Sequence, residues 1–198
     1  MPKQVTYYLA LNSPWAYLGS RRLAEIARKH GASVDVRPIR IDAVFAATGG
    51  LPLKQRPKQR QAYRMHELRR WRDHLNVPIN LEPAHFPADE TLAAQCVIAV
   101  RAAGGDALAL ASAFGRVIWE QERDLADAAV VRDVLTVLGH DADSIMSKAR
   151  APETAAERER LSVEAISAGV FGVPTYFVDG EPFWGQDRLD FVDRKLAR

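Results

Sequence analysis

The stretch that decides the fold is residues 169–188, GVFGVPTYFVDGEPFWGQDR. It contains an apolar run at 176–178, an Asp179-Gly180 pair and then a second short run. Two such runs separated by Asp-Gly are typical of a β-hairpin with a two-residue turn. A helical pattern over 187–196 follows. We therefore predict that the chain ends in two antiparallel strands and a helix.

The other end of the chain has the pattern strand, helix, strand. Val5–Leu11 is an apolar run rich in β-forming residues, which predicts a buried strand. Ser13-Pro14 marks a helix start, because serine is a favoured N-cap and proline suits the first helical turn. Gly31 is suited to end that helix. Ser33–Ile39 then alternates polar and apolar residues and predicts a second strand, which completes a βαβ unit.

Between these ends the sequence is helical in character. Asp89-Glu90 places negative charge at the start of one predicted helix, where the helix dipole favours it. A further helix over 152–168 leads into the hairpin. Another has an apolar stripe at helical spacing, formed by Ala62, Met65, Leu68, Trp71 and Leu75.

This order of elements predicts an α/β, thioredoxin-like fold that carries a large all-helical insertion. We expect residues 1–41 and 153–198 to form one discontinuous thioredoxin-like domain, with residues 42–152 as the insertion. The two ends would share one small sheet, and the insertion would cover the site between them.

Val173-Pro174-Thr175, before the first hairpin strand, resembles the proline loop of thioredoxin-like proteins. In that superfamily the proline is cis, and the exposed backbone before it pairs with a thiol peptide such as glutathione. The alternative is an ordinary trans proline that opens a strand. The rest of the chain favours the first interpretation.

Composition limits the class of protein. The chain has 198 residues and a net charge of +2, which is too small to imply nucleic-acid binding. No apolar run reaches the roughly 20 residues that cross a bilayer, and the N-terminus lacks the apolar segment of a signal peptide. We expect a cytoplasmic protein. The single cysteine cannot form an internal disulfide, and the five histidines show no metal-ligand spacing.

One stretch is strongly basic, with Glu67 as its one acid. Its basic residues are Lys54, Arg56, Lys58, Arg60, Arg64, Arg69, Arg70 and Arg72. Most would lie on the solvated face of a helix. Some could instead form a positive rim that attracts an anionic small molecule. A nucleic-acid patch ranks last, because no binding motif accompanies the charge.

Four motifs in order carry a more specific resemblance. They are Ser13-Pro-x-x-Tyr-Leu, the segment from Arg60-x-x-Tyr63 to Phe86-Pro87, Gly-Val-Pro-Thr at 172–175, and Trp184-Gly-x-Asp-Arg. Together they resemble the 2-hydroxychromene-2-carboxylate isomerases, relatives of the kappa-class glutathione transferases and of the DsbA-like disulfide oxidoreductases. The resemblance covers most of the chain.

Ser13 is the candidate catalytic residue. Redox-active thioredoxin-like proteins carry Cys-x-x-Cys at this helix start, but here the segment is Ser-Pro-Trp-Ala, so dithiol exchange is excluded. A serine hydroxyl can donate a hydrogen bond to a thiolate, and the helix N-terminus stabilises negative charge. Both effects lower the pKa of a thiol, which by resemblance belongs to glutathione. The alternative is that Ser13 acts as the N-cap alone.

The resemblance also implies the residues that bind glutathione. The Val173 backbone beside Pro174 would pair with the cysteinyl part. Gln186 and Asp187 would hold the γ-glutamyl end, with Trp184 beside them. For Asp187 a role as helix N-cap is nearly as plausible, and for Trp184 core packing is the alternative.

The basic position that contacts glutathione in the kappa-class relatives matches Arg60. An Asn in their Asn-x-Pro-Pro turn is missing here, since the turn at 49–53 is Gly-Gly-Leu-Pro-Leu. Lys54, Arg56 or Lys58 could compensate. Trp15, Tyr63 and Arg60 are the candidates for binding an anionic aromatic substrate.

We therefore predict a glutathione-dependent isomerase of 2-hydroxychromene-2-carboxylate or a related intermediate of aromatic catabolism. Glutathione is the expected cofactor, no metal is needed, and a homodimer is expected without nucleic-acid or membrane partners. One alternative is a kappa-like transferase that conjugates glutathione to electrophiles. A second is a non-catalytic thioredoxin-like module that binds glutathione or a peptide.

Overall fold

A four-stranded mixed sheet lies at the centre of the computed structural model, which describes residues 3–198. Strands β1 (Gln4–Leu9), β2 (Ser33–Pro38), β3 (Thr175–Val178) and β4 (Glu181–Trp184) lie in the order β2-β1-β3-β4. β1 is parallel to β2 and antiparallel to β3, which pairs in turn with β4. The two ends of the chain therefore share one sheet, and the predicted fold class is confirmed.

Nine α-helices complete the described chain. They are α1 (Pro14–His30), α2 (Ile41–Thr48), α3 (Lys58–Leu75), α4 (Thr91–Ala102), α5 (Ala107–Trp119), α6 (Ala128–Val137), α7 (Ala142–Ala149), α8 (Pro152–Ser167) and α9 (Leu189–Leu196). Two 3₁₀ turns, η1 (Leu53–Gln55) and η2 (Gln186–Arg188), precede α3 and α9. In the described residues no helix is both long and apolar enough to span a bilayer.

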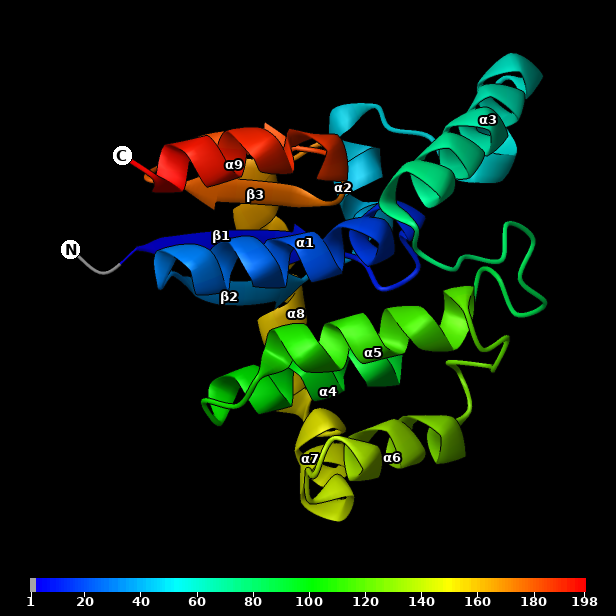
Figure 1. The fold of residues 1–198 in the computed structure, drawn as a ribbon. Helices are drawn as coiled ribbons and strands as arrows, with labels where there is room; N and C mark the ends of the chain where they lie inside the picture. Colours follow the sequence, from blue (N-terminus) through cyan, green and yellow to red (C-terminus); the bar gives the residue numbers. More distant parts are fainter. Residues whose placement is uncertain (1–2) are drawn as a thin grey trace.

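Alternate residues of β1 supply the two faces of the sheet. Tyr7 is buried on the face covered by α1 and α9, where its ring stacks on Tyr176 at 5.1 Å between centroids. Tyr8 belongs to a separate cluster with Ile39 and Leu161. That cluster lies between the sheet and α8, on the opposite face from α1 and α9. In Figure 1, α8 passes behind the sheet, and α1 and α9 lie in front of it.

Helix α1 begins and ends as predicted. The Ser13 Oγ accepts a hydrogen bond from the Ala16 N–H at 3.2 Å, and Pro14 occupies the first turn. Gly31 ends the helix with φ +60°, in the left-handed region that favours glycine. An N-cap of this kind stabilises a helix by about 1 kcal/mol.

The C-terminal hairpin is also confirmed. Asp179 and Gly180 have φ +50° and +79°, so both turn residues are left-handed, as a type I′ turn requires. The Val173-Pro174 peptide bond is cis, as the resemblance implied. The last helix differs from the prediction, because η2 comes first and α9 begins at Leu189.

The remaining helices position the walls of the site. α4 packs on β2 and on α7, and α5 packs on α1, so α4–α7 lie together on the β2 side of the molecule. α3 projects on the other side, beside the N-terminal end of α1 (Figure 1). A long connection from α3 to α4 contains a second cis peptide bond, Phe86-Pro87.

Candidate active site

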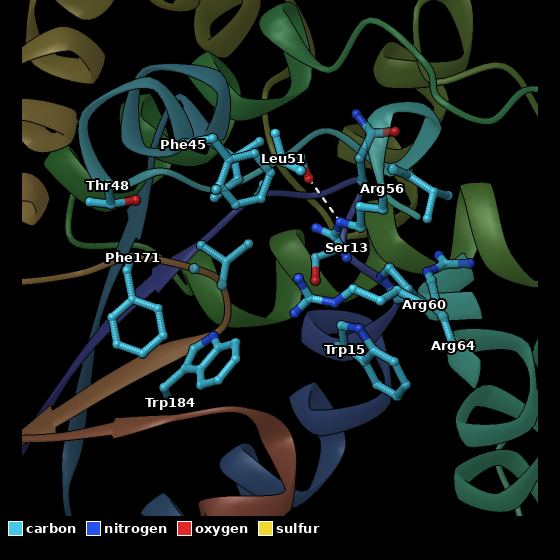
Figure 2. Close-up of a pocket in the computed structure, with 18 of the residues that line it drawn as sticks. Ser13, Trp15, Phe45, Thr48, Leu51, Arg56, Arg60, Arg64, Phe171 and Trp184 are labelled. Atoms are coloured by element: carbon cyan, nitrogen blue, oxygen red, sulfur yellow. Dashed lines mark hydrogen bonds between the residues drawn. The ribbon is translucent and has the colours of Figure 1, made fainter. Parts of the chain in front are cut away.

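One pocket of about 560 Å³ lies where three parts of the chain meet (Figure 2). These parts are the start of α1, the segment from α2 into the first two turns of α3, and the C-terminal hairpin with the loop before it; Phe86 adds to the wall from the connection between α3 and α4. The side chains labelled in Figure 2 are Ser13, Trp15, Phe45, Thr48, Leu51, Arg56, Arg60, Arg64, Phe171 and Trp184. Because these residues are far apart in sequence, the pocket is a product of tertiary folding.

Ser13 lines this pocket with a side chain that is largely buried, since the residue is 9% exposed. Within residues 3–198 its hydroxyl accepts one hydrogen bond, from the Ala16 N–H, and donates none. The backbone N–H of Trp15, in the first turn of α1, also has no acceptor in this part of the chain. Two donors at a helix N-terminus are therefore free for an anion.

Val173 lines the same pocket. Its N–H and C=O make no backbone hydrogen bond within the described chain. The residues around it are held firmly, because the Thr175 hydroxyl donates to the Gly172 carbonyl at 2.7 Å and the Gly185 N–H donates to the Pro174 carbonyl at 2.9 Å. Backbone groups that are free beside the end of a strand can pair with the backbone of a peptide.

Three arginines place an excess of positive charge on the pocket. Arg56, Arg60 and Arg64 all line it, and none forms an ion pair with a carboxylate in residues 3–198. Burial and the charge of Arg56 lower the pKa of Arg64 to about 10, and burial and the charge of Arg60 lower the pKa of Arg56. An anionic ligand would relieve the repulsion among these guanidinium groups.

Aromatic side chains form the opposite wall of the pocket. Phe171 and Trp184 pack on each other with centroids 4.7 Å apart, and Phe45 lines the far side (Figure 2). Gly172 makes room for the indole, because a Cβ at this position would lie 2.7 Å from the Trp184 Nε1. Trp184 is 53% exposed, so the alternative of core packing does not describe it.

A smaller hollow of about 270 Å³ adjoins the main pocket and shares Trp15, Val173 and Trp184 with it. Asp187 and Glu67 both line this hollow. An ion pair with Arg70 lowers the pKa of Glu67, and Asp187 pairs at 3.2 Å with Arg188, which also lines the hollow. With two carboxylates and one arginine in its lining, the hollow carries an excess of negative charge, which favours a cationic group.

The remaining predicted site residues are placed less centrally. Gln186 is 1% exposed, and its side-chain oxygen accepts from Arg22 at 3.2 Å, so the side chain links η2 to α1. Tyr63 is 59% exposed and does not line the main pocket. It lines a neighbouring hollow along α3, together with Arg60 and Trp15.

Several residues that line the main pocket or the adjoining hollow were not predicted from the sequence. Glu67 was noted as the one acid of the basic stretch, but nothing in its neighbours indicated that it would line a hollow together with Asp187. Phe45 and Phe171 are isolated aromatics with no motif of their own, and Phe86 belonged to a predicted motif but was not predicted to line the pocket. Their shared signal is proximity in space, which a single sequence does not carry.

The described residues contain no group of three or more potential metal ligands.

A family model for the DSBA-like thioredoxin domain matches residues 4–197. The chain belongs to this family. The 2-hydroxychromene-2-carboxylate isomerase of Sphingobium xenophagum is 33% identical over 99% of both chains. Glutathione S-transferase kappa 1 of Homo sapiens is 22% identical over 100% of this chain and 92% of its own length.

Solved structures show the same fold for this DSBA-like chain. A 2-hydroxychromene-2-carboxylate isomerase superposes with a TM-score of 0.82 at 24% identity, over 98% of this chain and 95% of that one. The cytosolic disulfide reductase DsbM from Pseudomonas aeruginosa, solved with GSH, has a TM-score of 0.70 at 16% identity, over 98% and 96%. The predicted family resemblance is thereby confirmed.

Proposed function

We propose that this DSBA-like protein is a glutathione-dependent cis–trans isomerase that acts on 2-hydroxychromene-2-carboxylate or a related intermediate of aromatic catabolism. The full-length relative at 33% identity carries that isomerase name. One observation carries the proposal: the free Ser13 hydroxyl lies in one pocket with the free Val173 backbone, three arginines without carboxylate partners and an aromatic wall.

The residues of the site fit glutathione part by part. The Val173 backbone suits the cysteinyl unit, which would bring the sulfur to Ser13. Asp187 and Glu67 suit the ammonium group of the γ-glutamyl unit in the adjoining hollow. Arg60 suits the glycine carboxylate. It lines the pocket together with the turn at 49–53, which lacks the asparagine that contacts glutathione in the kappa-class relatives.

When bound, glutathione would supply a thiolate that adds to the conjugated C=C of the ring-opened substrate and leaves again after rotation about the resulting single bond. Ser13 would donate its hydroxyl hydrogen bond to the sulfur, and the free Trp15 N–H would add the field of the α1 N-terminus. A charge-assisted hydrogen bond contributes about 1.5–3 kcal/mol, and each pKa unit corresponds to about 1.4 kcal/mol. Ser13 would thus lower the thiol pKa by about 1–2 units.

The substrate would lie between the arginines and the aromatic wall. Arg64 is held over the Phe86 ring, with its Cζ 5.8 Å from the ring centroid, and lines the pocket. Its charge suits the substrate carboxylate. The Phe171–Trp184 pair suits the aromatic ring of the substrate, because offset or tilted packing of rings is favourable.

The test is a titration of the protein with glutathione by calorimetry and by ultraviolet thiolate absorbance, followed by incubation with 2-hydroxychromene-2-carboxylate. We expect binding, an ionised thiol at neutral pH, and formation of the trans-alkene product only when glutathione is present. Absence of binding at millimolar glutathione would overturn the proposal. Binding and thiol ionisation without turnover of any hydroxychromene carboxylate would leave the substrate assignment refuted and the cofactor assignment supported.

A second candidate is a kappa-like transferase, favoured by the full-length similarity to glutathione S-transferase kappa 1. The two activities differ in their product. An isomerase returns glutathione unchanged, whereas a transferase consumes it and releases a thioether. Mass spectrometry of the reaction mixture distinguishes these outcomes.

A further inference from the structure

A buried ion pair lies behind the loop that leads into α1. Glu90 and Arg158 are 8% and 7% exposed, and the Glu90 Oε1 accepts from the Arg158 Nη2 at 2.9 Å. Glu90 directly precedes α4, where its charge was expected to serve the helix terminus. Its side chain instead makes no capping hydrogen bond and belongs to the interior.

The second oxygen of Glu90 holds the residue before Ser13. The Glu90 Oε2 accepts from the Asn12 backbone N–H at 2.7 Å and from the Asn12 Nδ2 at 2.9 Å. The Asn12 side chain also pairs in both directions with the backbone of Ala88, at 2.9 and 3.0 Å. Asn12 is thereby fixed through both its backbone and its side chain.

This network joins three parts of the pocket frame. Arg158 lies in α8, Glu90 at the start of α4, and Asn12 in the loop between β1 and α1. Ala88 follows the cis Phe86-Pro87 bond, and Phe86 lines the pocket. One carboxylate therefore links the Ser13 loop to a wall of the pocket and to the helix behind the sheet.

The stability of the fold does not explain the pair. Removing two charges from water costs free energy, and apolar residues of similar size often replace such pairs without loss of stability. A carboxylate can accept the two hydrogen bonds from Asn12, and an apolar side chain cannot. A group that holds a catalytic loop to within a fraction of an ångström has a large effect on rate.

We propose that Glu90, acting through Asn12, is a positioning residue that holds the Ser13 hydroxyl in place at the start of α1. The catalytic part of this inference rests on the proposed function, whereas the structural part concerns the ligand-free loop. Glu90 itself does not line the main pocket, so its effect passes through Asn12, which does.

Two matched double variants separate the hydrogen bonds from the charge. E90Q/R158M removes both charges and keeps an oxygen that can accept from Asn12. E90L/R158M also removes both charges but has no acceptor. We expect E90Q/R158M to keep kcat/KM within about twofold of the parent, and E90L/R158M to lose about 10- to 100-fold, in line with the cost of misplacing a reacting group.

Two further readouts show that this loss comes from positioning. In E90L/R158M the pKa of the bound glutathione thiol should rise, while the affinity for S-methylglutathione, which has no thiol to ionise, should change little. In the ligand-free protein, hydrogen exchange of the Ala16 N–H, which is bonded to the Ser13 Oγ, should be faster in E90L/R158M than in E90Q/R158M. Equal turnover, thiol pKa and exchange in the two variants would overturn the proposal.

The exchange measurement keeps this test separate from the proposed function. If the parent does not bind glutathione, the proposed function fails, and equal or unequal exchange of the Ala16 N–H still decides whether Glu90 holds the loop. Should E90L/R158M fail to fold, E90M/R158M takes its place, because methionine is close in shape to glutamine and has no oxygen to accept from Asn12. Faster Ala16 exchange in this variant than in E90Q/R158M supports the proposal, and equal exchange refutes it.

Discussion

Replacing Ser13 separates its two roles, because the same oxygen caps α1 and would face the glutathione sulfur. Ser13→Ala removes both. Losing the cap should cost about 1 kcal/mol of unfolding free energy, which lowers Tm by about 2–4 °C in a chain of this size. Losing the hydrogen bond should raise the pKa of the bound thiol by about 1–2 units.

The consequence for rate depends on pH. A thiol is active as the thiolate, so below its pKa the rate falls about tenfold per pH unit. A raised pKa in Ser13→Ala therefore lowers turnover at neutral pH, by at most about 10- to 100-fold because the parent thiol is already ionised there, and the deficit should shrink as the pH rises. Thiolate absorbance of the complex and the pH profile of kcat/KM measure the two effects independently.

Ser13→Asp is the matched control. A carboxylate caps a helix about as well as serine, so Tm should stay close to that of the parent. It cannot donate a hydrogen bond when ionised and it repels a thiolate, so turnover should fall at least as far as in Ser13→Ala. Full turnover in Ser13→Ala, with an unchanged pKa of the bound thiol, would refute this reasoning.

The other predictions concern the arginines, the acidic hollow and the single cysteine. Arg64→Met should raise KM for a carboxylate substrate about tenfold, the value of one charge-assisted contact, whereas Arg69→Met on the exposed side of α3 should leave KM unchanged. Asp187→Asn and Glu67→Gln should each weaken glutathione binding in calorimetry but not the binding of a glutathione analogue that lacks the amino group; equal losses for both ligands would contradict the assignment. Burial raises the pKa of Cys96 to about 12, so the native protein should resist alkylation at neutral pH until it is unfolded, and prompt labelling would show that the thiol is accessible.

Elements governed by neighbouring residues were predictable from the sequence. The hairpin follows from Asp179-Gly180, because an Asp-Gly pair adopts the left-handed turn that joins twisted strands. The start and end of α1 follow from Ser13 and Gly31, which satisfy backbone groups within one helical turn. The boundary of α9 was less accurate, since η2 and α9 differ in hydrogen bonding but not in amino-acid pattern.

By itself, then, the sequence determined the hairpin turn and the two ends of α1, which depend on interactions between residues close in the chain. The cis proline loop was implied by the family resemblance, and α2 and α7 were not predicted. Tertiary structure alone decided which arginines line the pocket, that Glu67 and Asp187 line the same hollow, and that Glu90 accepts hydrogen bonds from Asn12, 78 residues away in the sequence. The physical reason is that helical periodicity defines the faces of a helix but not the neighbour that each face meets. That choice is made when the sheet and helices pack and bury their apolar surface together.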